Sequence, residues 1–90
     1  MVDDRLPGAG LVRQGVADLK NRIESVEALL VSIGAPRLRA LGVDVPPPVS
    51  DPEHRLYAIL SRSDPDGAHS KYNALVRRLV SFERALACDR

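Results

Sequence analysis

The 90-residue chain has few of the residues that build a large core or a covalent crosslink. It has no tryptophan, and its aromatic residues are Tyr57, Tyr72 and Phe82. Cys88 is the only cysteine, which excludes an intramolecular disulfide. A chain of this length buries only about 60–65% of the surface that its unfolded form exposes. Because leucine, valine and alanine bury less area per side chain than aromatic residues do, the sequence predicts a thin core.

Strong net charge and long apolar runs are also absent. The net charge is +1 at pH 7, with acidic and basic residues in both halves, which argues against a strongly basic nucleic-acid-binding protein. No apolar run is longer than Ala28–Val31, so the sequence contains no candidate for a membrane-spanning helix. Asp3 and Asp4 lie in an N-terminal segment without an apolar stretch, which does not resemble a secretory signal. With a lone cysteine, these features predict a cytoplasmic protein.

The clearest pattern is a heptad repeat in the first third of the chain. Apolar residues recur there at alternating intervals of four and three, the spacing of one face of a helix. The repeat comprises Val12, Val16, Leu19, Ile23, Val26, Leu30 and Ile33. Gly34 and Pro36 follow it and predict a helix end, since glycine accepts a positive φ and proline cannot continue the helix. The sequence therefore predicts one long helix over residues 11–33.

Proline and glycine also mark the segments between helices. Residues 1–10 contain one proline and two glycines and predict a flexible N-terminal arm. Gly42 is expected to end a further short helical stretch. The segment 43–49 contains three successive prolines, which exclude a helix and predict an extended linker. A stiff spacer is favoured over a ligand for a proline-binding domain, because no PxxP arrangement with a flanking basic residue is present.

Two more helices are predicted in the second half. Ser50 is a capping residue, Pro52 suits a first turn and Glu53 completes a capping box. Together they predict a helix over residues 52–62. Aspartate, proline and glycine in residues 63–67 predict a tight turn, although their resemblance to the preceding helix start leaves a direct helix start open.

The predicted last helix, over residues 68–87, carries more apolar surface than one neighbouring helix would cover. Its main stripe comprises Ala68, Tyr72, Leu75, Leu79, Phe82 and Leu86, and its second stripe comprises Val76, Val80 and Ala87. Glu83 lies on the second stripe, where we expect a solvated rim rather than an ion pair with an arginine of a neighbouring helix. The three helices predict an all-α fold, a small antiparallel three-helix bundle with residues 11–90 as a single helical domain.

Residues that could perform chemistry are scarce. His54 has an alanine four residues later, so it lacks a second metal ligand one turn away. Arg62 and His69 have a spacing that is similar to that of HEPN-type ribonucleases, helical proteins in which arginine and histidine act on a phosphodiester. The resemblance implies proton transfer by His69 and phosphate binding by Arg62. The turn between them and the short chain depart from that family, and we expect no catalytic residue, metal, cofactor or small-molecule substrate.

Basic side chains gather on the predicted last helix. Lys71 and Arg78 lie on one flank and Arg77 and Arg84 on another, with Glu83 as the only acid nearby. Such a face could contact phosphates in a salt-sensitive manner. No aromatic residue is interleaved with these arginines to stack on bases. A solvated helix face is therefore the favoured interpretation, and nucleic-acid binding is the alternative.

These patterns favour a non-catalytic interaction module, such as an adaptor, a regulator or a small accessory subunit. A thin core and excess apolar stripes predict a core shared with a protein partner or with a second copy of the chain, as in a coiled coil. The residues expected at that interface are Val12, Val16, Leu19, Ile23, Val26, Leu30, Val76, Val80 and Glu83. A subunit that contacts a nucleic-acid backbone is the second hypothesis, and a HEPN-like ribonuclease is the third.

Overall fold

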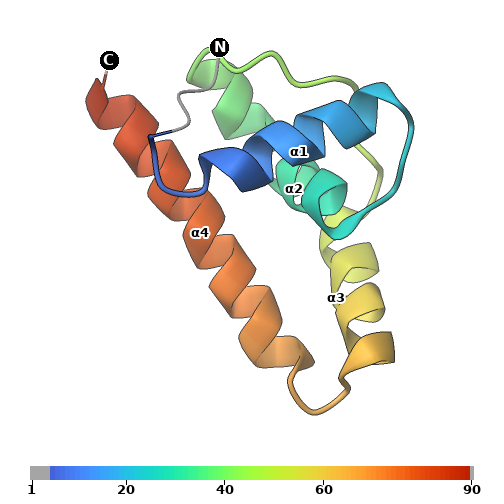
Figure 1. Ribbon diagram of the computed structural model, residues 1–90. Helices are drawn as coiled ribbons and strands as arrows, with labels where there is room; N and C mark the ends of the chain where they lie inside the picture. The colour runs from blue at the N-terminus through green and yellow to red at the C-terminus, as the bar shows by residue number, and fades with distance from the viewer. Residues whose placement is uncertain (1–4, 90) are drawn as a thin grey trace.

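The computed structural model describes residues 5–89, which form four helices and no strand. The helices are α1 (Ala9–Lys20), α2 (Val26–Ala40), α3 (Pro52–Ser63) and α4 (Ala68–Asp89). The all-helical fold is as predicted, but these residues form four helices rather than a three-helix bundle. Figure 1 shows α1 lying across α2, while α3 and α4 form a hairpin that opens toward them.

The single helix predicted over residues 11–33 is wrong, because a turn divides it. The amide of Ile23 donates to the carbonyl of Asp18 at 2.8 Å, and that of Arg22 donates to the carbonyl of Leu19 at 3.1 Å. These two bonds make a Schellman motif, which needs a residue with positive φ just after the helix end. Arg22 takes that position with a φ of 58°. The heptad spacing continues through the turn, so periodicity alone concealed the break.

A serine cap starts α2 directly after the turn. Ser25 Oγ accepts a hydrogen bond from the amide of Ala28 at 3.0 Å and donates one to Asp18 Oδ2 at 2.5 Å. Gln14 Nε2 donates to the other carboxylate oxygen of Asp18 at 2.9 Å. Asp18 is buried. Its carboxylate therefore joins the last turns of α1 to the cap of α2 and fixes how the two helices meet.

Gly15 allows α1 and α2 to cross at close range. A Cβ atom at this position would collide with the carbonyl of Glu27 and with the side chain of Val31. The two halves of the heptad repeat consequently pack against each other within one chain.

The predicted helix end at Gly34 and Pro36 is also wrong, since α2 continues through both residues. It ends instead before Gly42, which has a φ of 95°. The amide of Val43 donates to the carbonyl of Leu38 at 2.9 Å, again as in a Schellman motif. Gly42 thus supplies the positive φ that was expected of Gly34.

The proline-rich linker that follows contains no helix and is bonded to α2. Arg39 Nη2 donates to the carbonyl oxygens of Val45 at 2.9 Å and Pro46 at 3.1 Å. Farther along, the amide of Val49 donates to Ser32 Oγ at 3.0 Å. These bonds hold the linker against the helix that precedes it.

The N-terminal arm predicted over residues 1–10 needs correction as well. Residues 1–4 lie outside the described part of the chain. Ala9 is buried within the first turn of α1, and Gly8, with a φ of 78°, lies against α4. A Cβ atom on Gly8 would be 2.9 Å from the carbonyl oxygen of Arg78. The residues just before α1 are therefore packed against the rest of the protein.

The α3–α4 hairpin closely follows the helices predicted over residues 52–62 and 68–87. The capping box does not form, because the N-cap residue is Asp51, which has a φ of 51° and no side-chain cap. In the loop between the helices, Asp64 Oδ1 accepts a hydrogen bond from the amide of Gly67 at 3.0 Å. The rings of Tyr57 and Tyr72 meet between the helices, with centroids 5.9 Å apart.

Candidate functional site

The interface residues predicted on the heptad repeat do not form an exposed ridge. Val12, Leu19 and Leu30 are buried, and Val16 and Val26 are half-buried. Because the repeat is divided between α1 and α2, its two halves supply core contacts within the chain. The prediction that this stripe forms a continuous docking surface is therefore wrong.

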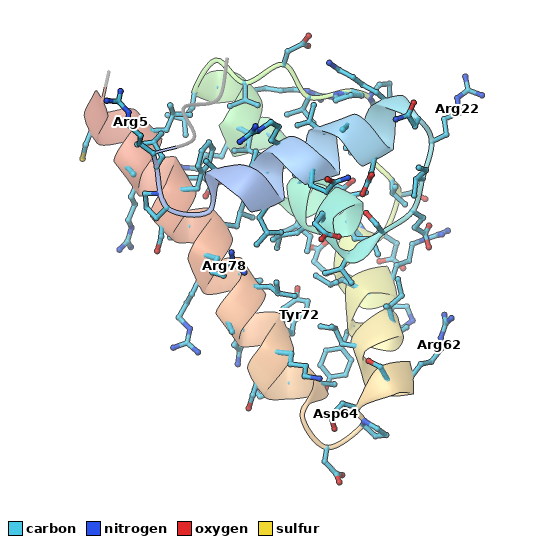
Figure 2. All side chains as sticks on the ribbon, viewed as in Figure 1. Arg5, Arg22, Arg62, Asp64, Tyr72 and Arg78 are labelled. Carbon is cyan, nitrogen blue, oxygen red and sulfur yellow. The ribbon has the colours of Figure 1, made fainter. Side chains whose placement is uncertain are left out.

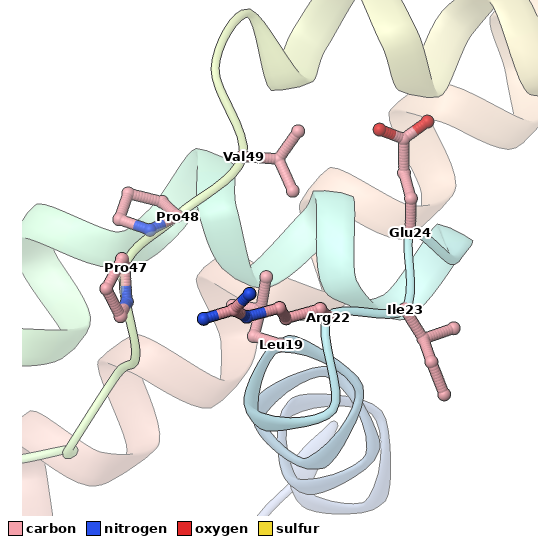
Figure 3. Close-up of a pocket in the computed structure, with 7 residues that line it drawn as sticks. All are labelled: Leu19, Arg22, Ile23, Glu24, Pro47, Pro48 and Val49. Carbon is pink, nitrogen blue, oxygen red and sulfur yellow. The ribbon is translucent and has the colours of Figure 1, made fainter.

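Ile23 is the exception among these residues, with 51% of its surface exposed. In a Schellman motif the residue at this position commonly packs on the last turn of the helix that has just ended. Here the isoleucine projects from the outer side of the turn, as Figure 3 shows. The turn thus presents a large apolar side chain to solvent.

Beside Ile23 lies an open pocket of about 240 Å³ between the α1–α2 turn and the proline-rich linker (Figure 3). We call its lining the turn–linker surface; it comprises Leu19, Arg22, Ile23, Glu24, Pro47, Pro48 and Val49. Leucine, proline and valine make most of this lining apolar. Arg22 and Glu24 add one charge of each sign.

Both walls of the pocket are held in place by hydrogen bonds. On one side, Asp18 and Ser25 fix the turn. On the other, Ser32 holds the amide of Val49. Glu24 also forms an ion pair with Arg55 of α3 at 2.8 Å. The pocket is thus formed in the free protein, as ligand and partner sites commonly are.

The sequence identified Leu19 and Ile23 as interface residues but missed the rest of this surface. Pro47 and Pro48 are far from the turn in sequence, and the bonds between linker and α2 bring them there, together with the burial of Val43 and Val45. One local signal of the turn was present. Ser25 followed by Glu27 is typical of a helix start, with a capping hydroxyl and an acid in the first turn.

Glu83 does not lie at a solvated rim, as was predicted, because only 6% of its surface is exposed. It sits against α2, where a Cβ atom on Gly34 would be 3.1 Å from Glu83 Oε2. Burial raises the pKa of the Glu83 carboxyl, and the positive charge of Arg37 partly opposes this shift. Val76 and Val80, on the same stripe, are half-buried. Glu83 is thus a core residue and not a surface contact.

Arg62 and His69, the two residues whose spacing resembles the HEPN pair, do not form a hydrogen bond with each other. In Figure 2, Arg62 extends from α3 away from α4. The ring Nε2 of His69 lies 3.2 Å from Asn73 Nδ2, one turn along α4. His54, the other histidine, is exposed on α3. Within the described chain, no group of three or more histidine, cysteine, aspartate or glutamate residues could hold a metal ion.

The basic residues predicted on the last helix are all exposed on α4. They are Lys71, Arg77, Arg78 and Arg84. Lys71 Nζ lies 3.3 Å from Asp64 Oδ2, at the tip of the hairpin. Arg77 Nε donates to the carbonyl of Asn73 within its own helix at 3.4 Å. Burial of Glu83 leaves the exposed side chains of Ala68–Cys88 without an acid.

Among residues 5–89, none of the helices has both the length and the apolar character that crossing a bilayer requires. In comparisons with protein-family models, curated proteins and solved structures, nothing matches this chain.

Proposed function

We propose that this protein is a non-catalytic helical interaction module that binds another protein through the turn–linker surface. The observation that carries the proposal is the half-exposed Ile23, which stands beside an open, mostly apolar pocket. An exposed isoleucine next to a fixed pocket offers a partner both an apolar anchor and a place to insert one. The surrounding α-helices serve to hold that surface in shape.

The backbone of the turn supports this proposal. Arg22 occupies the left-handed region, which costs a residue other than glycine about 1–2 kcal/mol. Backbone strain of this kind tends to cluster at functional sites. Glycine would relieve the strain but would remove the guanidinium from the pocket wall. An arginine at this position is consistent with selection for binding, since arginine is enriched at protein interfaces.

The size of the pocket favours a protein partner over a small molecule. About 240 Å³ is below the roughly 300–1,000 Å³ that encloses a typical small ligand. A protein side chain inserted into it would continue the contact onto Ile23 and the prolines.

The proposal replaces the predicted coiled coil. The heptad residues that would face a partner helix are buried in the core or half-buried against it, except for Ile23. The exposed part of the repeat is thus limited to Ile23, which lies in the turn that follows α1. We therefore propose a local contact instead of pairing along a full helix.

The test compares two exposed apolar positions. Ile23→Lys places a charge on the turn–linker surface, and Tyr57→Lys makes the same kind of change on α3, where Tyr57 is 40% exposed. Proteins that co-purify with wild type from cells expressing the chain are identified, and the affinity of each purified partner is measured by calorimetry. Loss of one interface anchor weakens binding about 30-fold or more.

We expect Ile23→Lys to lose a partner that Tyr57→Lys retains, with both variants folded by circular dichroism. Light scattering tests whether that partner is a second copy of the chain. Equal binding by wild type and Ile23→Lys would refute the proposal.

A further inference from the structure

Charge is unevenly divided along this nearly neutral chain. Residues 1–67 contain ten acidic and eight basic residues, whereas residues 68–88 contain four basic residues and one acid. That acid is Glu83, which is buried against α2. The exposed surface of α4 from Ala68 to Cys88 consequently carries charge of one sign.

The cations are spaced along the helix. Arg77 and Arg84 are seven residues apart, which places them two turns apart on one side, about 10 Å along the axis. Lys71 and Arg78 repeat that spacing on a neighbouring flank. Among the described residues neither Arg78 nor Arg84 forms an ion pair. Ser70 and Asn73 lie on the same side as Arg77 and add neutral hydrogen-bond donors.

We infer that this cationic face of α4 binds the phosphate backbone of double-stranded nucleic acid without reading its sequence. Charge complementarity supplies the attraction, because each arginine that neutralises a phosphate releases counterions from the duplex. Arginine also forms bidentate hydrogen bonds with phosphate oxygens. The serine and asparagine side chains on this face suit further contacts with the backbone.

The residues around the arginines favour a duplex over other polyanions. A helix that lies on a membrane surface needs large apolar side chains beside its cations, and the exposed positions of α4 from Ala68 to Cys88 hold no apolar side chain larger than a cysteine. Single strands are held by stacking on exposed aromatic rings. Of the two aromatic residues of α4, Phe82 is buried, and Tyr72 lies between α3 and α4 against Tyr57 (Figure 2).

This surface is separate from the one proposed to bind protein. The α1–α2 turn and α4 lie at opposite sides of the molecule in Figure 1. The inference therefore goes beyond the proposed function, and variants of one surface leave the other intact.

The test measures binding of the full chain to fluorescent DNA and RNA duplexes of about 20 base pairs by anisotropy, at salt concentrations from about 50 to 200 mM. With two to four phosphate contacts, we expect the affinity to fall about 10- to 150-fold over that range. Two unrelated DNA sequences should bind equally well. The double variant Arg77→Glu/Arg84→Glu should lose binding, and Arg77→Lys/Arg84→Lys should retain most of it with a similar salt dependence.

A matched control separates location from net charge. Arg62→Glu, on the outer side of α3, makes the same change in charge at one position as Arg84→Glu does. We expect Arg84→Glu to weaken duplex binding and Arg62→Glu to leave it within about twofold of wild type. The inference is wrong if no duplex binds at low salt, if both single variants bind alike, or if only anionic vesicles or acidic polypeptides bind. Ile23→Lys should bind duplexes as wild type does, whatever its effect on protein partners.

Discussion

Asp18 and Ser25, which lie seven residues apart, share a hydrogen bond of 2.5 Å across the break between α1 and α2. The same carboxylate accepts from Gln14, and the same hydroxyl caps α2 at Ala28. One buried acid thus determines where the first helix stops and where the second begins. The position of Ile23, which lies between them, depends on this network.

Replacing Asp18 should therefore destabilise the fold. Asp18→Ala leaves the Ser25 and Gln14 donors without their acceptor, which we expect to lower the free energy of unfolding by about 2–3 kcal/mol. Ser25→Ala removes the helix cap and should cost about 1 kcal/mol. Urea denaturation followed by circular dichroism measures both. In a double-mutant cycle the two effects should be less than additive, because they share one bond; strict additivity would contradict a direct interaction.

Arg22 offers a substitution in the opposite direction. Arg22→Gly should raise the free energy of unfolding by about 0.5–1 kcal/mol, since glycine accepts a φ of 58° without strain but gains freedom in the unfolded chain. Asn21→Gly is the matched control, because the φ of Asn21 is −93° and glycine relieves nothing there. Thermal unfolding of wild type and of the two variants measures the change in stability. A stabilising Asn21→Gly, or a destabilising Arg22→Gly, would mean that the turn is held differently.

The all-helical fold could be predicted because helical periodicity is local. The spacing that gave helices over residues 52–62 and 68–87 depends on contacts within a few turns. The break in the first helix was hidden because Arg22, and not glycine, takes the left-handed position. Gly34 wrongly predicted a helix end, because a glycine can also allow close packing within a helix, here against Leu79 and Glu83.

The candidate site was predictable only in part, because it joins segments distant in sequence. Ile23 was predicted at an interface only as one of several residues of the heptad repeat. Three residues of the pocket, Pro47, Pro48 and Val49, come from the linker. Bonds from Arg39 and Ser32 to the linker backbone help to set its path. Both bonds join a side chain of α2 to the linker backbone, and neither leaves a periodic pattern in the sequence. The burial of Glu83 likewise depends on how closely α2 approaches α4.

Two glycines of α1 test how closely α1 and α2 pack. Gly15→Ala would force its methyl group into the backbone of Glu27, and we expect a loss of about 2 kcal/mol or more in the free energy of unfolding. Gly10→Ala meets nothing within 4 Å and should gain about 0.5–1 kcal/mol, because alanine favours the helix. Denaturant titration of both variants provides the comparison. Equal effects at the two positions would show that the helices do not cross at Gly15.

Glu83 should make stability depend on pH in a particular direction. Its carboxyl has a raised pKa because it is buried, above the ordinary value of 4.5. The folded state therefore holds the proton more tightly than the unfolded state. The protonated carboxyl contributes its full stability below about pH 4.5, and this contribution is lost as the pH rises through the folded pKa. Glu83→Gln stays neutral, so it should match wild type in acid and exceed its stability at neutral pH. Unfolding free energies of both proteins between those conditions give the difference. The prediction is wrong if the difference in unfolding free energy between the two proteins does not change with pH, or if wild type is the more stable at neutral pH. Either result would mean that the charge of Glu83 is compensated within the fold, and Arg37 would then be the first residue to substitute.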